Sequence, residues 1–340
     1  MRIKFWGVRG SVPCPPTNEE IRAKIKMALT RWTEESTQSL DEFLDSLPGW
    51  ISGLVGGNTI CLEISDNEEL LVFDAGTGLI RLGNFLIPAH LSELFERFYS
   101  AEKFPALCSP PQDGSLRKIK IFMTHTHWDH IQGFPFFRPA YVPYYHLEIY
   151  GADRVALKTA FETQMLAPSL FPVPLSFLKA KTRFHNFPLK GLKTGQFRLD
   201  CLALPHPGGS LAYRIQSHGK TVVFATDYEV QKLSQVGEPG PSHAEVSKFI
   251  RGADVLISDT QYTYLDHASK VGWGHSNALS VVELAAQAGV RALYLFHHDP
   301  TYNDEKLLDI LEKTRAYAKL LPNGADLAVS LALEGLTIDL

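Results

Sequence analysis

The feature that most constrains this chain is the segment Ile121–His130, which reads IFMTHTHWDH. An apolar run typical of a strand ends here in three histidines and an aspartate. Because extended backbone projects residues i and i+2 to one side, His125 and His127 can reach one metal ion. Asp129 and His130 follow at once and are expected to face a neighbouring position. Imidazole and carboxylate are the ligands that zinc-like divalent ions prefer, so the segment predicts two metal ions side by side and disfavours a solvated His-rich turn.

Four ligands from one loop cannot complete two metal sites, so further ligands are expected from later strands. Three later apolar runs, each a predicted strand, stop at such residues. These are Phe197–Leu204 before His206, Thr221–Ala225 before Asp227, and Ala292–Phe296 before His297 and His298. Loops at strand ends are where sheet proteins place chemistry on a rigid scaffold. Of the last two histidines, His297 aligns better as a ligand, and His298 is expected to face solvent.

These elements, in this order, resemble the metallo-β-lactamase-fold hydrolase superfamily. The resemblance runs from the opening MRIKFWGVRGS to about Asp304. It implies an α/β fold of the metallo-β-lactamase type, an αββα sandwich in which two mixed β-sheets are flanked by helices. The succession of predicted strands and helices along both halves of the chain fits the same architecture.

Two local features are similar to the phosphodiesterase branch, which includes the tRNA 3′-processing endonuclease and the phosphoribosyl cyclic phosphodiesterases. In the nucleases of this branch, a ligand His precedes a Tyr-Arg strand, as in LPHPGGSLAYR over Leu204–Arg214. They also have an acidic residue and a His-Ser/Thr pair, matched here by Asp259 and by His275-Ser276. The resemblance makes His275 the proton donor to the leaving group, oriented by Asp259. The alternative is that His275 merely precedes the helix expected from Ala278.

The resemblance also implies how the ligands divide. His125, His127 and His206 would hold one metal, Asp129, His130 and His297 the other, and Asp227 would bridge both. Asp129 also counts, with His275 and Asp259, among the expected catalytic residues. The ions are expected to be Zn²⁺, with Mn²⁺ or Fe²⁺ as alternatives. Iron oxidoreductases of this fold usually carry Glu where His127 stands, which favours hydrolysis.

The expected reaction is hydrolysis of a phosphodiester by a hydroxide that bridges two metal ions. His275 would then protonate the departing alkoxide. The expected substrate is a small anionic phosphodiester, cyclic or linear and nucleotide-like. The alternatives are an RNA-processing endonuclease, a lactone or thioester hydrolase of the same fold, and a metal-binding protein without turnover.

The composition fits this expectation. The formal net charge of −4 and the absence of a block of like charge argue against an extended nucleic-acid surface. The four cysteines have no CxxC spacing, which favours a reduced compartment. No secretory signal and no run as long as a membrane span are visible, so we expect a cytoplasmic protein.

We expect a single domain over residues 1–340, with a helical insertion at about 15–55 before the Gly-Gly-Asn-Thr element. Thr17 and Glu20 are spaced like a capping box, and one helical pattern runs to about Leu47, where Pro48-Gly49 stops it. The insertion could be a lid, a dimer contact or plain surface. A second segment, 134–180, could be a lid or the contact of a homodimer.

Two further expectations concern the first half of the chain. Asp74 follows a predicted strand and either supports the metal ligands from behind or is an ordinary turn residue. A helix is expected from Leu79 to about Phe98.

Overall fold

Two seven-stranded sheets form the centre of the computed structural model, which describes residues 1–34, 39–66, 68–87, 115–230 and 241–340. The first sheet has the order β14 (Thr337–Asp339), β1 (Arg2–Gly7), β2 (Cys61–Ser65), β3 (Leu70–Phe73), β4 (Arg117–Phe122), β5 (Tyr145–Gly151), β6 (Lys181–Asn186). The second has the order β13 (Ala328–Leu331), β12 (Ala292–Phe296), β11 (Val255–Asp259), β10 (Lys220–Ala225), β9 (Ser210–Ser217), β8 (Phe197–Leu204), β7 (Leu192–Thr194). Both sheets contain parallel and antiparallel pairs.

The side-chain alternation of the strands builds the layers. In β4, Phe122 joins the core between the two sheets, whereas Ile119 and Ile121 point to the opposite face and join a second apolar cluster. Phe73 packs between Phe122 and Phe224 of the facing sheet, with ring centroids 5.3 and 5.8 Å away. The inner strands of the first sheet therefore need a cover on both faces, which reads in β3 as a continuous apolar run.

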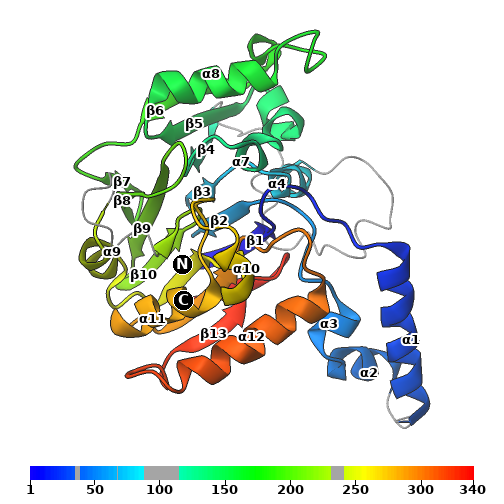
Figure 1. Ribbon diagram of the computed structural model, residues 1–340. Helices are drawn as coiled ribbons and strands as arrows, with labels where there is room; N and C mark the ends of the chain where they lie inside the picture. The colour runs from blue at the N-terminus through cyan, green and yellow to red at the C-terminus, as the bar shows by residue number, and fades with distance from the viewer. Residues whose placement is uncertain (35–38, 67, 88–114, 231–240) are drawn as a thin grey trace.

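Helices provide the outer covers (Figure 1). The helices α4 (Gly78–Leu86) and α8 (Arg154–Gln164) contact the first sheet, and α11 (Ala278–Gln287) and α12 (Asp304–Ala318) contact the second. The helix α9 (His243–Ile250) packs beside α11. The prediction of an αββα sandwich is confirmed. Among the helices that the structure describes, none is both long and apolar enough to cross a membrane.

The directions of the strands place the loops of the expected site at one end of the second sheet. The strands β10, β11 and β12 are mutually parallel. The strand β9 runs antiparallel to both β10 and β8, so β8 points the same way as β10. The loops that follow β8, β10, β11 and β12 consequently all lie at the same end of the second sheet, where these four strands terminate.

The insertion consists of three helices, α1 (Asn18–Glu34), α2 (Leu40–Ser46) and α3 (Gly49–Ser52), which project to one side in Figure 1. The capping pair of Thr17 and Glu20 forms as expected. The expectation of one helical pattern to Leu47 is wrong, because Ser39 and Glu42 make a second capping box that starts α2. The insertion is attached to the start of α12 by an ion pair between Lys24 and Asp304.

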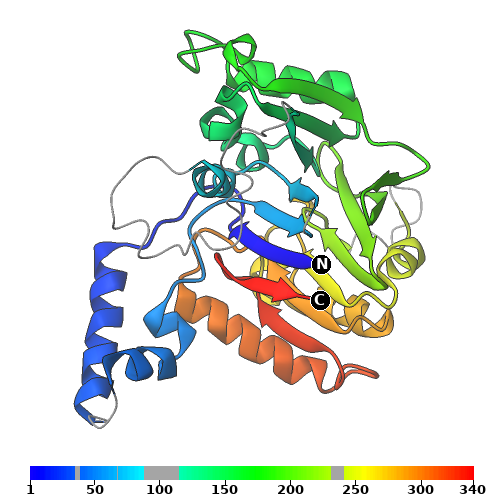
Figure 2. The same ribbon diagram turned by 180° about the vertical axis from the view of Figure 1, so that it is seen from behind.

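The C-terminal strands β13 and β14 had no strong pattern in the sequence, and each extends one sheet at its edge beside β12 or β1. Figure 2 shows the two chain ends side by side, where the backbone N–H of Leu340 donates to the carbonyl of Met1 at 2.9 Å. The expected helix from Leu79 forms as α4 up to Leu86, and its continuation beyond residue 87 lies outside the described residues.

We predict that deleting Thr17–Leu47 and resealing the loop leaves the metal content unchanged. The deletion removes Lys24, one partner of the buried Asp304 carboxylate. That carboxylate would keep two other partners, the Arg9 side chain 3.6 Å away and the backbone N–H of Val55. Elemental analysis of the purified variant measures the outcome. Loss of bound metal from a variant that still unfolds cooperatively would show that the insertion belongs to the site.

Candidate metal centre

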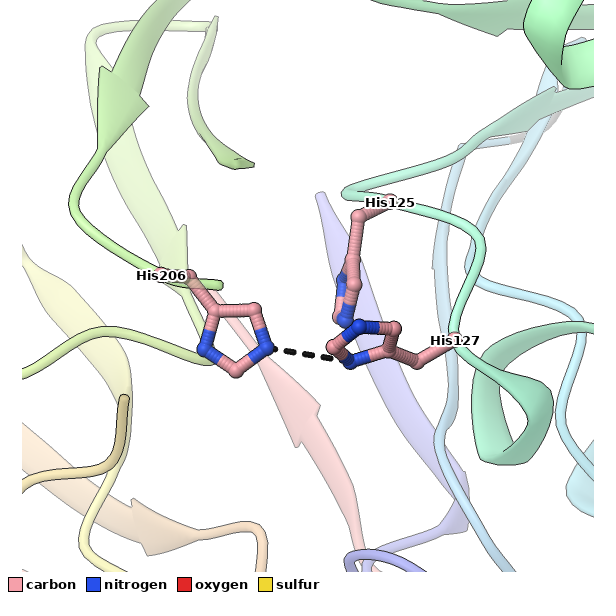
Figure 3. Close-up of side chains that lie close together, drawn as sticks. All are labelled: His125, His127 and His206. Atoms are coloured by element: carbon pink, nitrogen blue, oxygen red, sulfur yellow. Dashed lines mark hydrogen bonds between the residues drawn. The ribbon is translucent and has the colours of Figure 1, made fainter. Parts of the chain in front are cut away.

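Residues from both sheets meet at one point between the strand ends. His125 and His127 project from the loop after β4, and His206 faces them from the loop after β8 (Figure 3). His127 Nδ1 lies 3.1 Å from His206 Nε2. Two ligands of a tetrahedral ion at zinc–nitrogen distances are about 3.3 Å apart. The three imidazoles are therefore placed as ligands of one ion would be.

A second cluster lies beside the first and has the same spacing. Nε2 of His130 and Nε2 of His297 each lie 3.5 Å from Asp129 Oδ2. Both nitrogens also lie 3.3 Å from Asp227 Oδ1. These separations match those between ligands around one small divalent ion.

Asp227 lies between the two clusters and turns one oxygen to each. Its Oδ1 faces His130 and His297, whereas its Oδ2 lies 3.8 Å from both His125 Nε2 and His206 Nε2. The carboxylate is buried, with only 1% of the residue exposed. A carboxylate in this position can reach ions in both clusters.

The outer nitrogens of these imidazoles have partners, and several inner nitrogens do not. His130 Nδ1 lies 2.9 Å from Asp74 Oδ2, His206 Nδ1 lies 2.9 Å from the Gly274 carbonyl, and His297 Nδ1 lies 3.0 Å from Gln261 Oε1. These contacts fix the ring tautomers so that Nε2 faces inward with its lone pair. Among the candidate ligands, the buried Nε2 atoms of His125, His130 and His297 have no hydrogen-bond partner in the described chain. Orphaned buried nitrogens need an explanation, and a shared cation supplies one.

Electrostatics prepare most of these rings to be ligands. Burial lowers the pKa of His125 well below its usual value, and the neighbouring charge of His130 adds to the effect. Burial also lowers the pKa of His206 to about 4, although Asp227 opposes it. In His130 burial acts in the same direction, but the carboxylates of Asp129 and Asp227 prevail and raise the pKa well above its usual value. A cation that binds there must displace a proton from His130.

The backbone around the site is unusual. Ser11, Asp74, Asp227 and His297 all adopt positive φ angles, between 56° and 63°. Non-glycine residues rarely adopt this conformation, and such residues cluster at functional sites. The turn at Ser11 aims its N–H at Asp129 Oδ2, 2.7 Å away. The same oxygen of Asp129 that lies near His130 and His297 is therefore also held by the backbone of Ser11.

Gly10 makes room for one of the candidate ligands. A Cβ atom built on Gly10 would lie 2.5–2.9 Å from ring atoms of His297. The segment that follows β1 thus passes directly against the imidazole, and a methyl group would push the ring away. Nothing in the sequence alone distinguished this glycine from others.

His275 and Asp259 lie next to the ion-binding clusters. His275 Nδ1 is 2.7 Å from Asp259 Oδ2 and 3.8 Å from Asp227 Oδ2. The shorter distance is that of a charge-assisted hydrogen bond and is too short for two ligands of one tetrahedral ion. Burial alone would lower the pKa of His275, but the charge of Asp259 and its hydrogen bond raise it to about 9. The pair is thus arranged as a proton donor and its orienting base.

The structure corrects one expectation and adds residues that the sequence did not reveal. His298 does not face solvent: it is 1% exposed, and its Nε2 lies 3.0 Å from the Ala332 carbonyl. The reason is that the chain turns at His297, so the next side chain points into the sandwich. Gln261 and the Gly274 carbonyl were missed because neither residue type signals metal binding. Asp74 lies behind His130, as one of its two expected roles requires.

A cavity of about 270 Å³ opens beside the first cluster. Its walls include His125, His127 and Thr126, the Gly208-Gly209 turn, and the loop at Gly151. A cavity of this size has room for a small group next to the metal ligands.

Comparison with known families agrees with the fold. A family model described as "Beta-lactamase superfamily domain" matches residues 71–298, more than half of the chain. The chain therefore belongs to the β-lactamase superfamily. The matched range contains all of the candidate ligands and the His275–Asp259 pair.

Individual relatives show which kinds of protein the chain is similar to. The chain is 26% identical over 222 residues to the Ribonuclease Z of Brevibacillus brevis, covering 55% of this chain and 70% of that protein. The structure is similar to that of unliganded yeast PDE1, with a TM-score of 0.64, 16% identity and coverage of 100% and 99% of the two chains. It is also similar to the short form of human tRNase Z, with a TM-score of 0.55, 16% identity and coverage of 100% and 99%. The two structures support the fold.

We predict that Gly10→Ala lowers the occupancy of one metal position per chain, because the added methyl group displaces the imidazole of His297. Gly49→Ala is the matched control, since a Cβ atom there meets nothing within 4 Å. Metal analysis after dialysis against a weak chelator measures both variants. Equal metal retention by Gly10→Ala, Gly49→Ala and the unaltered protein would contradict the role given to Gly10.

Proposed function

We propose that this protein is a phosphodiesterase with two divalent metal ions, and that its substrate is a small nucleotide-like phosphodiester. The observation that carries the proposal is the convergence of orphaned Nε2 atoms on the carboxylates of Asp129 and Asp227, beside a separate His275–Asp259 pair. The ribonuclease relatives confirm the coarser prediction of a hydrolase that acts on phosphodiesters.

In this proposal His125, His127 and His206 hold one ion, Asp129, His130 and His297 hold the other, and Asp227 bridges them. Zinc fits these nitrogen and oxygen ligands, and manganese or iron is the alternative. When bound, such a pair of ions supplies a water that is deprotonated near neutral pH and neutralises charge on the phosphoryl oxygens. Asp74, Gln261 and the Gly274 carbonyl keep the ligand rings in their tautomers.

In this proposal His275 is the proton donor. Its Nδ1–H is engaged by Asp259, which leaves Nε2 as the nitrogen that can hand a proton to a departing oxygen. This pair also weighs against thioester hydrolysis, because a thiolate leaves without the help of an acid. The His275–Asp259 pair also weighs against a metal-binding protein without turnover, because ion binding alone does not require a proton donor.

The size of the substrate rests on two observations. The cavity of about 270 Å³ beside His125 and His127 suits a small group, and the formal net charge of −4 offers little attraction to a long polyanion. The second candidate function is RNA processing, which the names of the ribonuclease relatives favour. Assays of the metal-loaded protein on cyclic nucleotides, dinucleoside monophosphates and precursor tRNA separate the two. A preference for precursor tRNA over every small diester would favour RNA processing as the function.

We predict that His275→Ala slows hydrolysis of esters with poor alkoxide leaving groups by about 10²–10⁴-fold, the usual contribution of a general acid. A p-nitrophenyl ester of the same nucleotide should lose much less, because nitrophenolate leaves without protonation. Asp259→Asn should show the same selectivity more weakly. Initial rates on both esters, with the metal content measured in parallel, give the result.

His243→Ala, a change in the first turn of α9 away from the site, is the control and should affect neither ester. Equal losses on the two esters by a fully metallated His275→Ala protein would remove this residue from the role of acid and assign it to substrate positioning.

A further inference from the structure

The segment between β11 and α11 exposes an unusual number of large apolar side chains. Tyr264, Leu265, Val271 and Trp273 are 64%, 81%, 60% and 61% exposed. The same segment ends at His275. Exposed apolar groups gathered beside a catalytic centre indicate a surface that binds something.

Trp273 is placed by contacts that lead directly to the site. Its neighbour Gly274 accepts the hydrogen bond of His206 through its carbonyl. The ammonium of Lys270 lies 5.9 Å from the Trp273 ring and 4.2 Å from the Tyr262 ring. The Tyr262 ring in turn meets the His275 imidazole edge-on, with centroids 5.8 Å apart. The exposed indole therefore lies on the side of the site that holds the proton donor.

This segment is held in place, although its apolar side chains face solvent. The buried carboxylate of Glu229 accepts hydrogen bonds from the backbone N–H groups of Gly272 at 2.8 Å and Gly274 at 3.4 Å. Lys270 is fixed by Asp299, 3.2 Å away. Because the backbone on both sides of Trp273 is held, a ligand ring that stacks on the indole orders less of the chain than it would on a loose loop.

We propose that Trp273 binds the leaving half of the substrate, and that this half is a nucleoside whose base stacks on the indole. The inference rests on the proposed function and names the chemical class that the site takes on the side of His275. In the step, the oxygen of water forms a bond to phosphorus and gives up one proton to solvent, and the bond between phosphorus and the nucleoside oxygen breaks. The proton of His275 goes to that oxygen and is replaced from solvent, and the base stays on Trp273 until the nucleoside departs. Aromatic stacking suits this task because every base has a π face.

The test compares two substrates that differ only in the leaving group. Product analysis first identifies which nucleoside of a dinucleoside monophosphate departs, and an analogue then replaces that nucleoside with methanol. Trp273→Ala should lower kcat/KM on the dinucleoside by about 5- to 150-fold, mainly through KM, and leave the methyl ester unchanged. Trp273→Phe should restore most of the loss. Phe177→Ala, which removes an exposed aromatic ring outside the site, should change neither substrate.

A binding measurement supplements the kinetics. The nucleoside that departs should quench the tryptophan fluorescence of the metal-free protein more than ribose does, and Trp273→Ala should remove this difference. Equal losses of Trp273→Ala on the two esters, or no loss on either, would overturn the inference and leave the phosphodiesterase intact. No hydrolysis of any diester by the metal-loaded protein would overturn the proposed function, and the inference with it.

Discussion

The junction between the two sheets at the end of β4 is the constraint on which the site depends. The hydroxyl of Tyr213, fully buried in β9, donates to the Met123 carbonyl at 2.6 Å, and the N–H of Leu211 donates to the Thr124 carbonyl at 3.0 Å. A buried hydroxyl must be satisfied, so these bonds lock the end of β4 onto the other sheet. His125, His127 and His130 come from one side of this junction, and His206, Asp227 and His297 come from the other. The junction therefore contributes to the fixed spacing of the two groups of ligands.

The same junction encloses polar groups that the protein chain alone does not satisfy. Burying Asp227 among imidazoles costs desolvation energy, and the charges of His297 and His130 outweigh that cost enough to keep its pKa well below the usual value. In the described part of the chain, the inward Nε2 atoms of His125, His130 and His297 have no hydrogen-bond partner. Because ions that bind only to the folded state stabilise it, bound metal should add to the stability of this sandwich as well as to its chemistry.

Much of this architecture was readable from the sequence, for a physical reason. The strands β8 and β12 begin and end where the sequence predicted, and a candidate ligand follows each at the same end of the sheet. In β12 the run ALYLF is apolar throughout, whereas β8 mixes buried residues such as Phe197 and Leu199 with exposed ones. The spacing of His125 and His127 required only the period of extended backbone. By contrast, β13 and β14 lie at sheet edges, where burial imposes a weaker pattern, and the start of α2 depended on a capping pair within a charged segment.

The parts of the site that the sequence did not reveal are backbone groups, or residue types that do not signal metal binding. Gln261, the Gly274 carbonyl and the space at Gly10 become meaningful only when distant segments are in contact. His298 shows the same limit. Its burial follows from the left-handed turn at His297, and nothing in the pair His-His predicts which ring points inward.

Two ions that share Asp227 can be located by anomalous scattering from crystals of protein grown with zinc and never exposed to chelator. Two peaks per chain are expected, one within bonding distance of His125, His127 and His206, the other of Asp129, His130 and His297, with Asp227 between them at about 2 Å from each. A single peak, or two peaks of which one lies at the His275–Asp259 pair, would contradict this arrangement.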